Sequence, residues 1–179
     1  MDFMDLLKSA GGDDSIGELA GAVGLGTSDT NKLIGALAPA LMSGLKKNTA
    51  SDDGLAGLRN ALQSGGHERY VDNPKLLRDD ATRSDGNKIL GHLFGSKDVS
   101  RNVAAHAAKE TGIDASIIKK ALPLLAGLAM GAMSKKSSGG RDLGSSASEG
   151  GLGPLGDLIG GGDGFGLDDV MGLARKFFK

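Results

Sequence analysis

Cysteine and tryptophan are absent from this 179-residue chain, and aromatic residues make up only 3% of it. Without cysteine the protein can form no disulfide, thiol nucleophile, Cys-ligated zinc site or iron–sulfur cluster. Five Phe and one Tyr are too few for the stacked aromatic surfaces that bind single-stranded nucleic acids or sugars. The composition therefore excludes several cofactor and ligand classes before any motif is considered.

The chain also lacks an excess of charge of one sign and a long hydrophobic run. Lys and Arg number 21 against 22 Asp and Glu, so we do not expect the chain as a whole to bind nucleic acid. The longest apolar run, 121–133, has 13 residues. A bilayer span needs about 20, so the run predicts a buried helix. The first five residues contain two acids, Asp2 and Asp5, where a secretion signal would be basic. This predicts a cytoplasmic protein.

Glycine is abundant, at 31 of 179 residues, and its distribution divides the chain. Residues 1–136 alternate apolar helical patterns with short polar breaks and predict an all-helical globular domain. Residues 137–166 are rich in Gly and Ser and predict a flexible linker. Residues 167–179 recover a strong periodicity and predict a separate amphipathic helix.

The apolar residues recur at helical spacing, and no useful stretch alternates with the period of a strand. The sequence therefore predicts an all-α fold, a helical bundle. The predicted helices span 3–10, 16–23, 33–45, 55–62, 88–94, 99–110 and 114–136. Asp98 or Ser100 is the expected cap of the helix at 99–110, and Asp85-Gly86 the expected turn and cap before the helix at 88–94. Tyr70 and Phe94 are predicted core aromatics.

Two segments resemble each other. Residues 18–47 and 102–136 each contain a small-residue helix, a Gly break, a polar cap and a long Leu/Ile helix. Each long helix contains a proline within an apolar run, Pro39 and Pro123, and proline bends a helix. The pattern predicts a duplicated helix-turn-helix-like motif with pseudo-two-fold symmetry.

Residues 104–118 have the spacing of a helix-turn-helix, with Gly112 at the turn. In a DNA reader Ser116, Lys119 and Lys120 would face the major groove. The second helix, however, continues into an apolar stretch that must be buried, and few basic residues are available for phosphates. The motif thus favours helix packing, and a DNA-binding regulator using residues 104–120 is the alternative.

Gly127 and Gly131 lie one helical turn apart and would let another helix approach closely. Glycine costs roughly 1 kcal/mol relative to alanine inside a helix, so two of them indicate a packing role. The spacing leaves two alternatives open, packing within one chain and packing across an assembly. We include both glycines among the candidate protein-interaction residues.

No catalytic or metal-binding pattern is evident. The three histidines, His67, His92 and His106, fall on different predicted elements, and no two are spaced as helical metal ligands. The sequence contains no HExxH, GxSxG or phosphate-binding GxxxxGK[ST] motif. We therefore predict no catalytic residue, no metal and no cofactor. An enzyme with a site assembled from these histidines would need a pocket that the sequence does not reveal.

The C-terminal segment, 167–179, carries the most specific pattern. Six apolar residues fall on one helical stripe, with acids in its first turn and bases in its last, as the helix dipole favours. The stripe consists of Leu167, Val170, Met171, Ala174, Phe177 and Phe178. It must be buried against its own domain, another subunit or a partner protein, and the sequence does not choose among them. A membrane surface is disfavoured because the polar face carries acids as well as bases.

Three motifs together resemble the YidB-like family of bacterial proteins of unknown function. They are SDGNKILGHLFGSK at 84–97, the Gly-Ile-Asp turn at 112–114 and LPLLA at 122–126. The resemblance covers roughly residues 15–136, and residues 168–177 resemble a tail on longer members. It implies an all-helical fold built from a duplicated three-helix-type motif, and it implies no activity, cofactor or catalytic residue.

These features together predict a non-enzymatic protein that acts through protein–protein contacts. We expect a homo-oligomer or a complex with another protein, formed by docking of the tethered C-terminal helix. The cellular role is not predicted.

Overall fold

The computed structural model describes residues 3–139 of the chain. Within that range it contains seven α-helices, one 3-10 helix and no strand, so the all-α prediction is confirmed. The elements are α1 (Phe3–Val23), α2 (Thr27–Thr49), α3 (Asp52–Ser64), α4 (Arg69–Asp72), η1 (Pro74–Arg78), α5 (Asp80–Phe94), α6 (Lys97–Thr111) and α7 (Ala115–Gly139).

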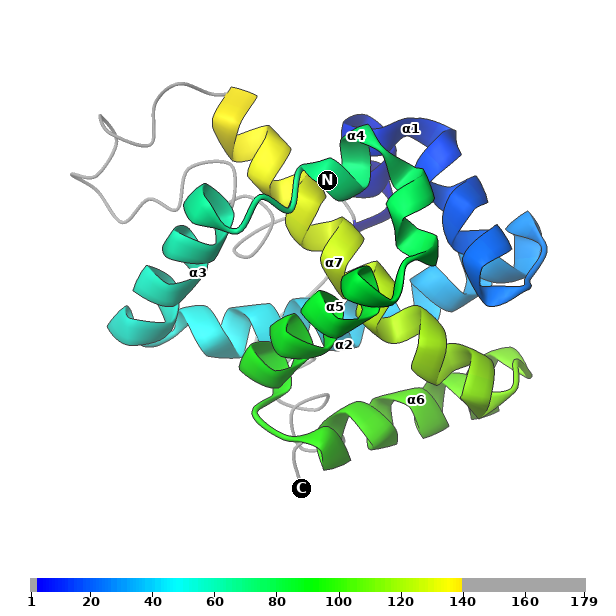
Figure 1. Ribbon diagram of the computed structural model, residues 1–179. Helices are drawn as coiled ribbons and strands as arrows, with labels where there is room; N and C mark the ends of the chain where they lie inside the picture. The colour runs from blue at the N-terminus through cyan, green and yellow to red at the C-terminus, as the bar shows by residue number, and fades with distance from the viewer. Residues whose placement is uncertain (1–2, 140–179) are drawn as a thin grey trace.

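Helix α7 lies at the centre of the molecule, and the other helices pack around it (Figure 1). Its residues 121–134 are all buried, because this stretch has no charged side chain and is covered on every side. By length and composition, residues 115–136 could cross a membrane, but 78% of the most apolar window is buried within the chain. The prediction of a buried helix at 121–133 is therefore confirmed.

Helices α6 and α7 are joined by a tight turn at Gly112, whose φ of 73° is left-handed and suits glycine. The Asp114 carboxylate accepts a hydrogen bond from the Ser116 backbone N–H at 2.7 Å and so caps α7. The cap of α6 is Ser96, whose hydroxyl accepts from the Val99 N–H. The expectation of a cap at Asp98 or Ser100 was wrong, because the helix begins two residues earlier than the apolar pattern does.

Helix α1 contains a break at Gly12, with φ 65° and ψ −171°, so its two halves match the predicted helices 3–10 and 16–23. A second left-handed glycine, Gly24, precedes α2, which contains Pro39. Each predicted repeat segment thus contributes a helix pair in contact, α1 with α2 and α6 with α7. The duplication itself stays a prediction.

Helix α5 begins at Asp80 rather than Lys88, so Asp85-Gly86 lies inside the helix and the predicted turn and cap there are wrong. Gly86 instead allows the α5 backbone to lie against α7. A Cβ on Gly86 would overlap the Pro123 carbonyl. The short elements α4 and η1 were not predicted, and α7 continues to Gly139, past the expected domain end at residue 136.

Candidate functional site

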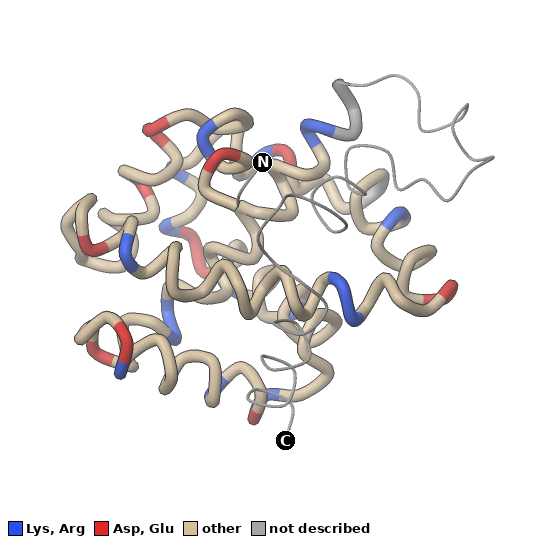
Figure 2. The backbone as a smooth tube through the Cα atoms, turned by 180° about the vertical axis from the view of Figure 1, so that it is seen from behind, with Lys and Arg blue, Asp and Glu red and all other residues tan. Residues whose placement is uncertain are grey.

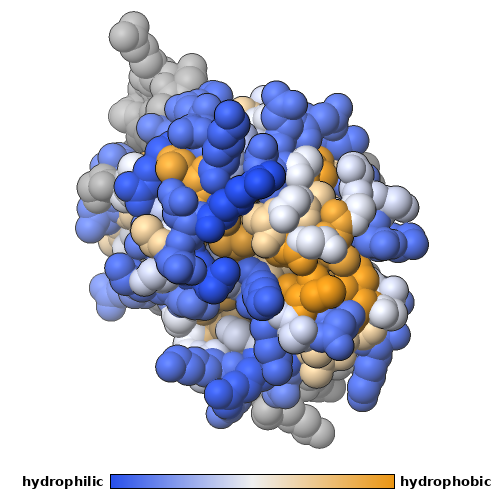
Figure 3. Space-filling view, turned by 45° about the vertical axis from the view of Figure 1, so that its right-hand side comes forward, coloured by the Kyte–Doolittle hydropathy of each residue, from blue (hydrophilic) through white to orange (hydrophobic). Residues whose placement is uncertain are grey.

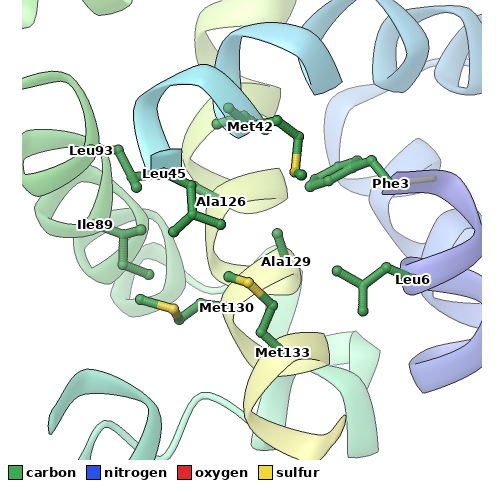
Figure 4. Close-up of a pocket in the computed structure, with 11 residues that line it drawn as sticks. Phe3, Leu6, Met42, Leu45, Ile89, Leu93, Ala126, Ala129, Met130 and Met133 are labelled. Carbon is green, nitrogen blue, oxygen red and sulfur yellow. The ribbon is translucent and has the colours of Figure 1, made fainter. Parts of the chain in front are cut away.

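An apolar hollow lies between four helices, and its wall is built from the side chains in Figure 4. Its free volume is small, about 20 Å³. Its lining comprises Phe3 and Leu6 from α1, Leu41, Met42 and Leu45 from α2, Ile89 and Leu93 from α5, and Ala126, Ala129, Met130 and Met133 from α7. Met42 and Leu93 are half-buried, whereas the other lining residues are buried.

The chemistry of the hollow is uniform, because every lining residue described is apolar. Sites for substrates and cofactors combine apolar walls with a few polar groups that orient the ligand. This hollow offers no such group among its lining residues, so its chemistry differs from that of such sites. Three of its residues are methionines, whose flexible thioethers adapt to partners of different shape.

The exterior around the described core is mostly hydrophilic, with a strip of hydrophobic atoms on the face shown in Figure 3. In Figure 2, residues of both signs are spread over the described helices. Half of the ion pairs described join residues three apart on one helix, as between Lys32 and Asp29. Such exposed pairs contribute little to stability.

The two glycines of the predicted interaction face lie inside the protein. A Cβ on Gly131 would overlap the His67 carbonyl, and one on Gly127 would lie 3.6 Å from the Tyr70 ring. Both residues are buried within one chain. The described structure therefore uses them for close packing of α7 against the start of α4, and they do not reach the surface where a second chain would meet them.

A polar network lies beside this contact. The Asp85 carboxylate accepts hydrogen bonds from the Tyr70 hydroxyl at 2.6 Å and from the Arg69 guanidinium at 2.7 Å. The hydrogen bond from Tyr70, together with nearby Lys88 and Arg69, lowers the pKa of Asp85. Burial, followed by the hydrogen bond to Asp85, raises the pKa of Tyr70. The network satisfies the polar tip of a ring that is only 1% exposed, so it supports the core role predicted for Tyr70.

His67 packs its ring 6.0 Å from the Tyr70 ring, and its buried Nδ1 has no hydrogen-bond partner among the described residues. Burial lowers the pKa of His67. His92 lies on α5 and His106 on α6, so the structure does not bring the three histidines together. Within residues 3–139, no group of three or more His, Asp or Glu side chains could hold a metal ion.

The lowered pKa values of His67 and Asp85 predict that stability falls as the pH is lowered. Below pH 6.5 the unfolded chain takes up a proton on His67 that the folded chain resists. The ionised Asp85 carboxylate stabilises the folded chain above pH 3.8, the ordinary pKa of an aspartate. This stabilisation is lost as the pH falls through the lower pKa that Asp85 has in the folded chain. Urea unfolding across the range from about pH 7.5 to about pH 3 measures both steps. His67→Gln should remove the loss of stability below pH 6.5, and Asp85→Asn should remove the loss at lower pH. A variant that still shows the loss assigned to its residue would contradict that assignment.

The residues of the DNA-binding alternative are at the surface. Ser116, Lys119 and Lys120 are exposed on the first two turns of α7, after the turn at Gly112. Residues 121–134 of the helix are buried, so the accessible part beside the Gly112 turn is this short N-terminal stretch.

The predicted docking stripe lies outside the described residues. This applies to Leu167, Val170, Met171, Ala174, Phe177 and Phe178, and to the predicted linker from residue 140 onward. The hollow, in contrast, was not found from the sequence. Its residues come from four helices, and each looks like an ordinary core position within its own helix.

The described residues thus form an all-helical protein with a small apolar hollow between α1, α2, α5 and α7. It belongs to the bacterial family of unknown function DUF937, which matches residues 5–136 and confirms the resemblance to the YidB-like family. Neither the curated proteins nor the solved structures contain a match to this chain.

Proposed function

We propose that this protein is a non-enzymatic interaction protein that self-associates or binds another protein through an amphipathic helix docked in an apolar groove. The observation that carries the proposal is the hollow between α1, α2, α5 and α7, which is lined by apolar side chains alone. The predicted helix at 167–179 supplies the complementary element, a stripe of six apolar residues that needs a surface to cover it.

Helix-in-groove binding depends on a few large apolar side chains at the centre of the contact. Phe177 and Phe178 are two of the five phenylalanines in the chain and lie on the predicted stripe. Phe3 and Phe94, by contrast, are buried in the described core. The C-terminal pair therefore supplies the aromatic anchors of the proposed contact.

We expect Phe177→Asp or Phe178→Asp to weaken association more than about 100-fold, because each removes a buried ring and places a charge in an apolar site. Light scattering over a concentration series measures the association of the full chain, the two variants and a chain ending at Lys136. Lys176→Ala is the matched control, since it changes the net charge by the same amount on the opposite helical face. Unchanged association in both Phe variants would contradict the proposal.

The second candidate function is a DNA-binding regulator that uses residues 104–120. The exposed Ser116, Lys119 and Lys120 beside the Gly112 turn favour it. A gel shift over a salt series separates the two functions. A DNA reader should lose affinity steeply as salt rises and should respond to Lys119→Ala and Lys120→Ala, whereas a helix-docking protein should show neither effect.

A further inference from the structure

We propose that Met42 is an oxidation site and that its conversion to the sulfoxide by hydrogen peroxide opens Met130 and Met133 to the same reaction. The chain has no cysteine, so its six methionines hold all of its sulfur. Three of them line the hollow between α1, α2, α5 and α7. The inference concerns a single chain and does not depend on the helix docking proposed above.

The three methionines differ in how easily a peroxide reaches them. In Figure 4 Met42 extends into the hollow from α2, whereas Met130 and Met133 extend from α7. Met42 is half-buried, but Met130 and Met133 are only 6% and 7% exposed. We therefore expect a peroxide in solution to react with Met42 before the other two.

The reaction needs no catalytic group from the protein. A lone pair of the Met42 thioether attacks one oxygen of hydrogen peroxide, so that an S–O bond forms and the O–O bond breaks. The departing hydroxide takes the proton from the transferred oxygen and leaves as water. The sulfur loses two electrons and the peroxide gains them, and the products are methionine sulfoxide and one water.

The sulfoxide of Met42 is poorly accommodated at the wall of the hollow. Its oxygen is a strong hydrogen-bond acceptor, whereas every residue described in the lining is apolar. The free volume of about 20 Å³ has room for one water at most. A polar group buried without a partner is unfavourable. Since Met42 is half-buried and its side chain has three rotatable bonds, we expect the sulfoxide to turn outward into solvent.

Displacement of Met42 leaves a gap in the wall on the α2 side. Water and peroxide that enter through this gap reach Met130 and Met133, because these residues line the same hollow. The cost of an unpaired polar oxygen shifts the wall from closed to open by about tenfold or more. Oxidation of the two buried methionines should therefore follow that of Met42. Methionine sulfoxide is reducible, so the opening is reversible.

A time course of oxidation of the full chain tests this order. The chain is treated with hydrogen peroxide, quenched at intervals and digested with trypsin, and mass spectrometry gives the sulfoxide fraction at each methionine. The tryptic peptide 33–46 contains Met42 alone, and the peptide 121–135 contains Met130 and Met133, which fragment spectra separate. We expect Met42 to oxidise first and the other two after a lag. Oxidation of Met130 or Met133 without a lag, or ahead of Met42, would overturn the proposal.

Two variants separate the chemistry of Met42 from its position. Met42→Leu keeps a similar volume but has no sulfur, so the oxidation of Met130 and Met133 should slow by about tenfold. Met42→Gln carries a permanent polar amide and should speed their oxidation by about tenfold, although it has no sulfur to oxidise. Unchanged rates in Met42→Leu, or rates in Met42→Gln as slow as those in Met42→Leu, would overturn the proposal.

Met4 provides the matched control. It is half-buried on α1 but is not among the residues that line the hollow. Met4→Leu and Met4→Gln should therefore leave the oxidation rates of Met130 and Met133 unchanged. The rate at Met4 in Met42→Gln is a second readout, because a general loosening of the fold would speed the oxidation of Met4 as well. Equal acceleration at Met4, Met130 and Met133 in that variant would overturn the proposal, whereas acceleration at Met130 and Met133 alone supports it.

Discussion

Gly86→Ala should lower the free energy of unfolding by about 2–3 kcal/mol or more, although alanine is the better helix former. Gly86 is buried in α5 where that helix crosses α7, and its added Cβ would overlap the carbonyl group of Pro123. Both groups belong to the backbone, so neither can rotate away, and the two helices would have to separate. The crossing lies beside the hydrogen bond between Tyr70 and Asp85, which a shift of α5 would also disturb.

Gly127→Ala is the matched control for that substitution. It is the same change in a buried glycine of a neighbouring helix, but the new Cβ would lie 3.6 Å from the Tyr70 ring, an ordinary contact. We expect it to be neutral or to stabilise by up to about 1 kcal/mol through helix propensity. Thermal or urea unfolding measures both variants, and the loss in Gly86→Ala corresponds to a fall in Tm of roughly 4–12 °C. Equal stability of the two variants would mean that α5 and α7 do not cross at Gly86.

The sequence predicted those helices whose apolar spacing is regular. Helices α2, α6 and α7 were placed from the repeats of Leu, Ile and Ala, and the turn at Gly112 was placed because a left-handed residue favours glycine. The start of α5 was missed because its first two turns are polar and contain Gly86, which is typical of a loop. The glycine is explained only by the helix lying across it, and contacts of that kind leave no local signal.

The sequence predicts the stripe at 167–179, but it does not predict the hollow. The stripe at 167–179 is a local pattern, so its periodicity can be recognised in the sequence alone. The hollow depends on where four helices meet, and Met42 and Met130 are 88 positions apart in the chain. The network of Tyr70 and Asp85 was missed for the same reason, since its partners are 15 residues apart on two elements. Long-range contacts of this kind come from packing rather than from periodicity.

Leu125→Ala should lower the free energy of unfolding by about 3–4 kcal/mol, because it removes a large side chain from the middle of the helix around which the others pack. Leu125 is 0% exposed and belongs to the run 121–134 that is buried throughout. A cavity at this position cannot collapse easily, since α1 and α5 hold α7 from different sides. Urea unfolding of the full chain, with the slope compared between variants, measures the loss.

The same substitution at Leu55 is the control for this effect. Leu55 is half-buried on α3, a peripheral helix, where neighbouring side chains and water can fill the space that is left. We expect Leu55→Ala to cost about 1 kcal/mol, well below the cost at Leu125. Comparable losses at the two positions would contradict the central place of α7. The central position of α7 also matters for the hollow, because α7 supplies Met130 and Met133 to its wall. A helix that is held from several sides keeps this wall in a fixed conformation.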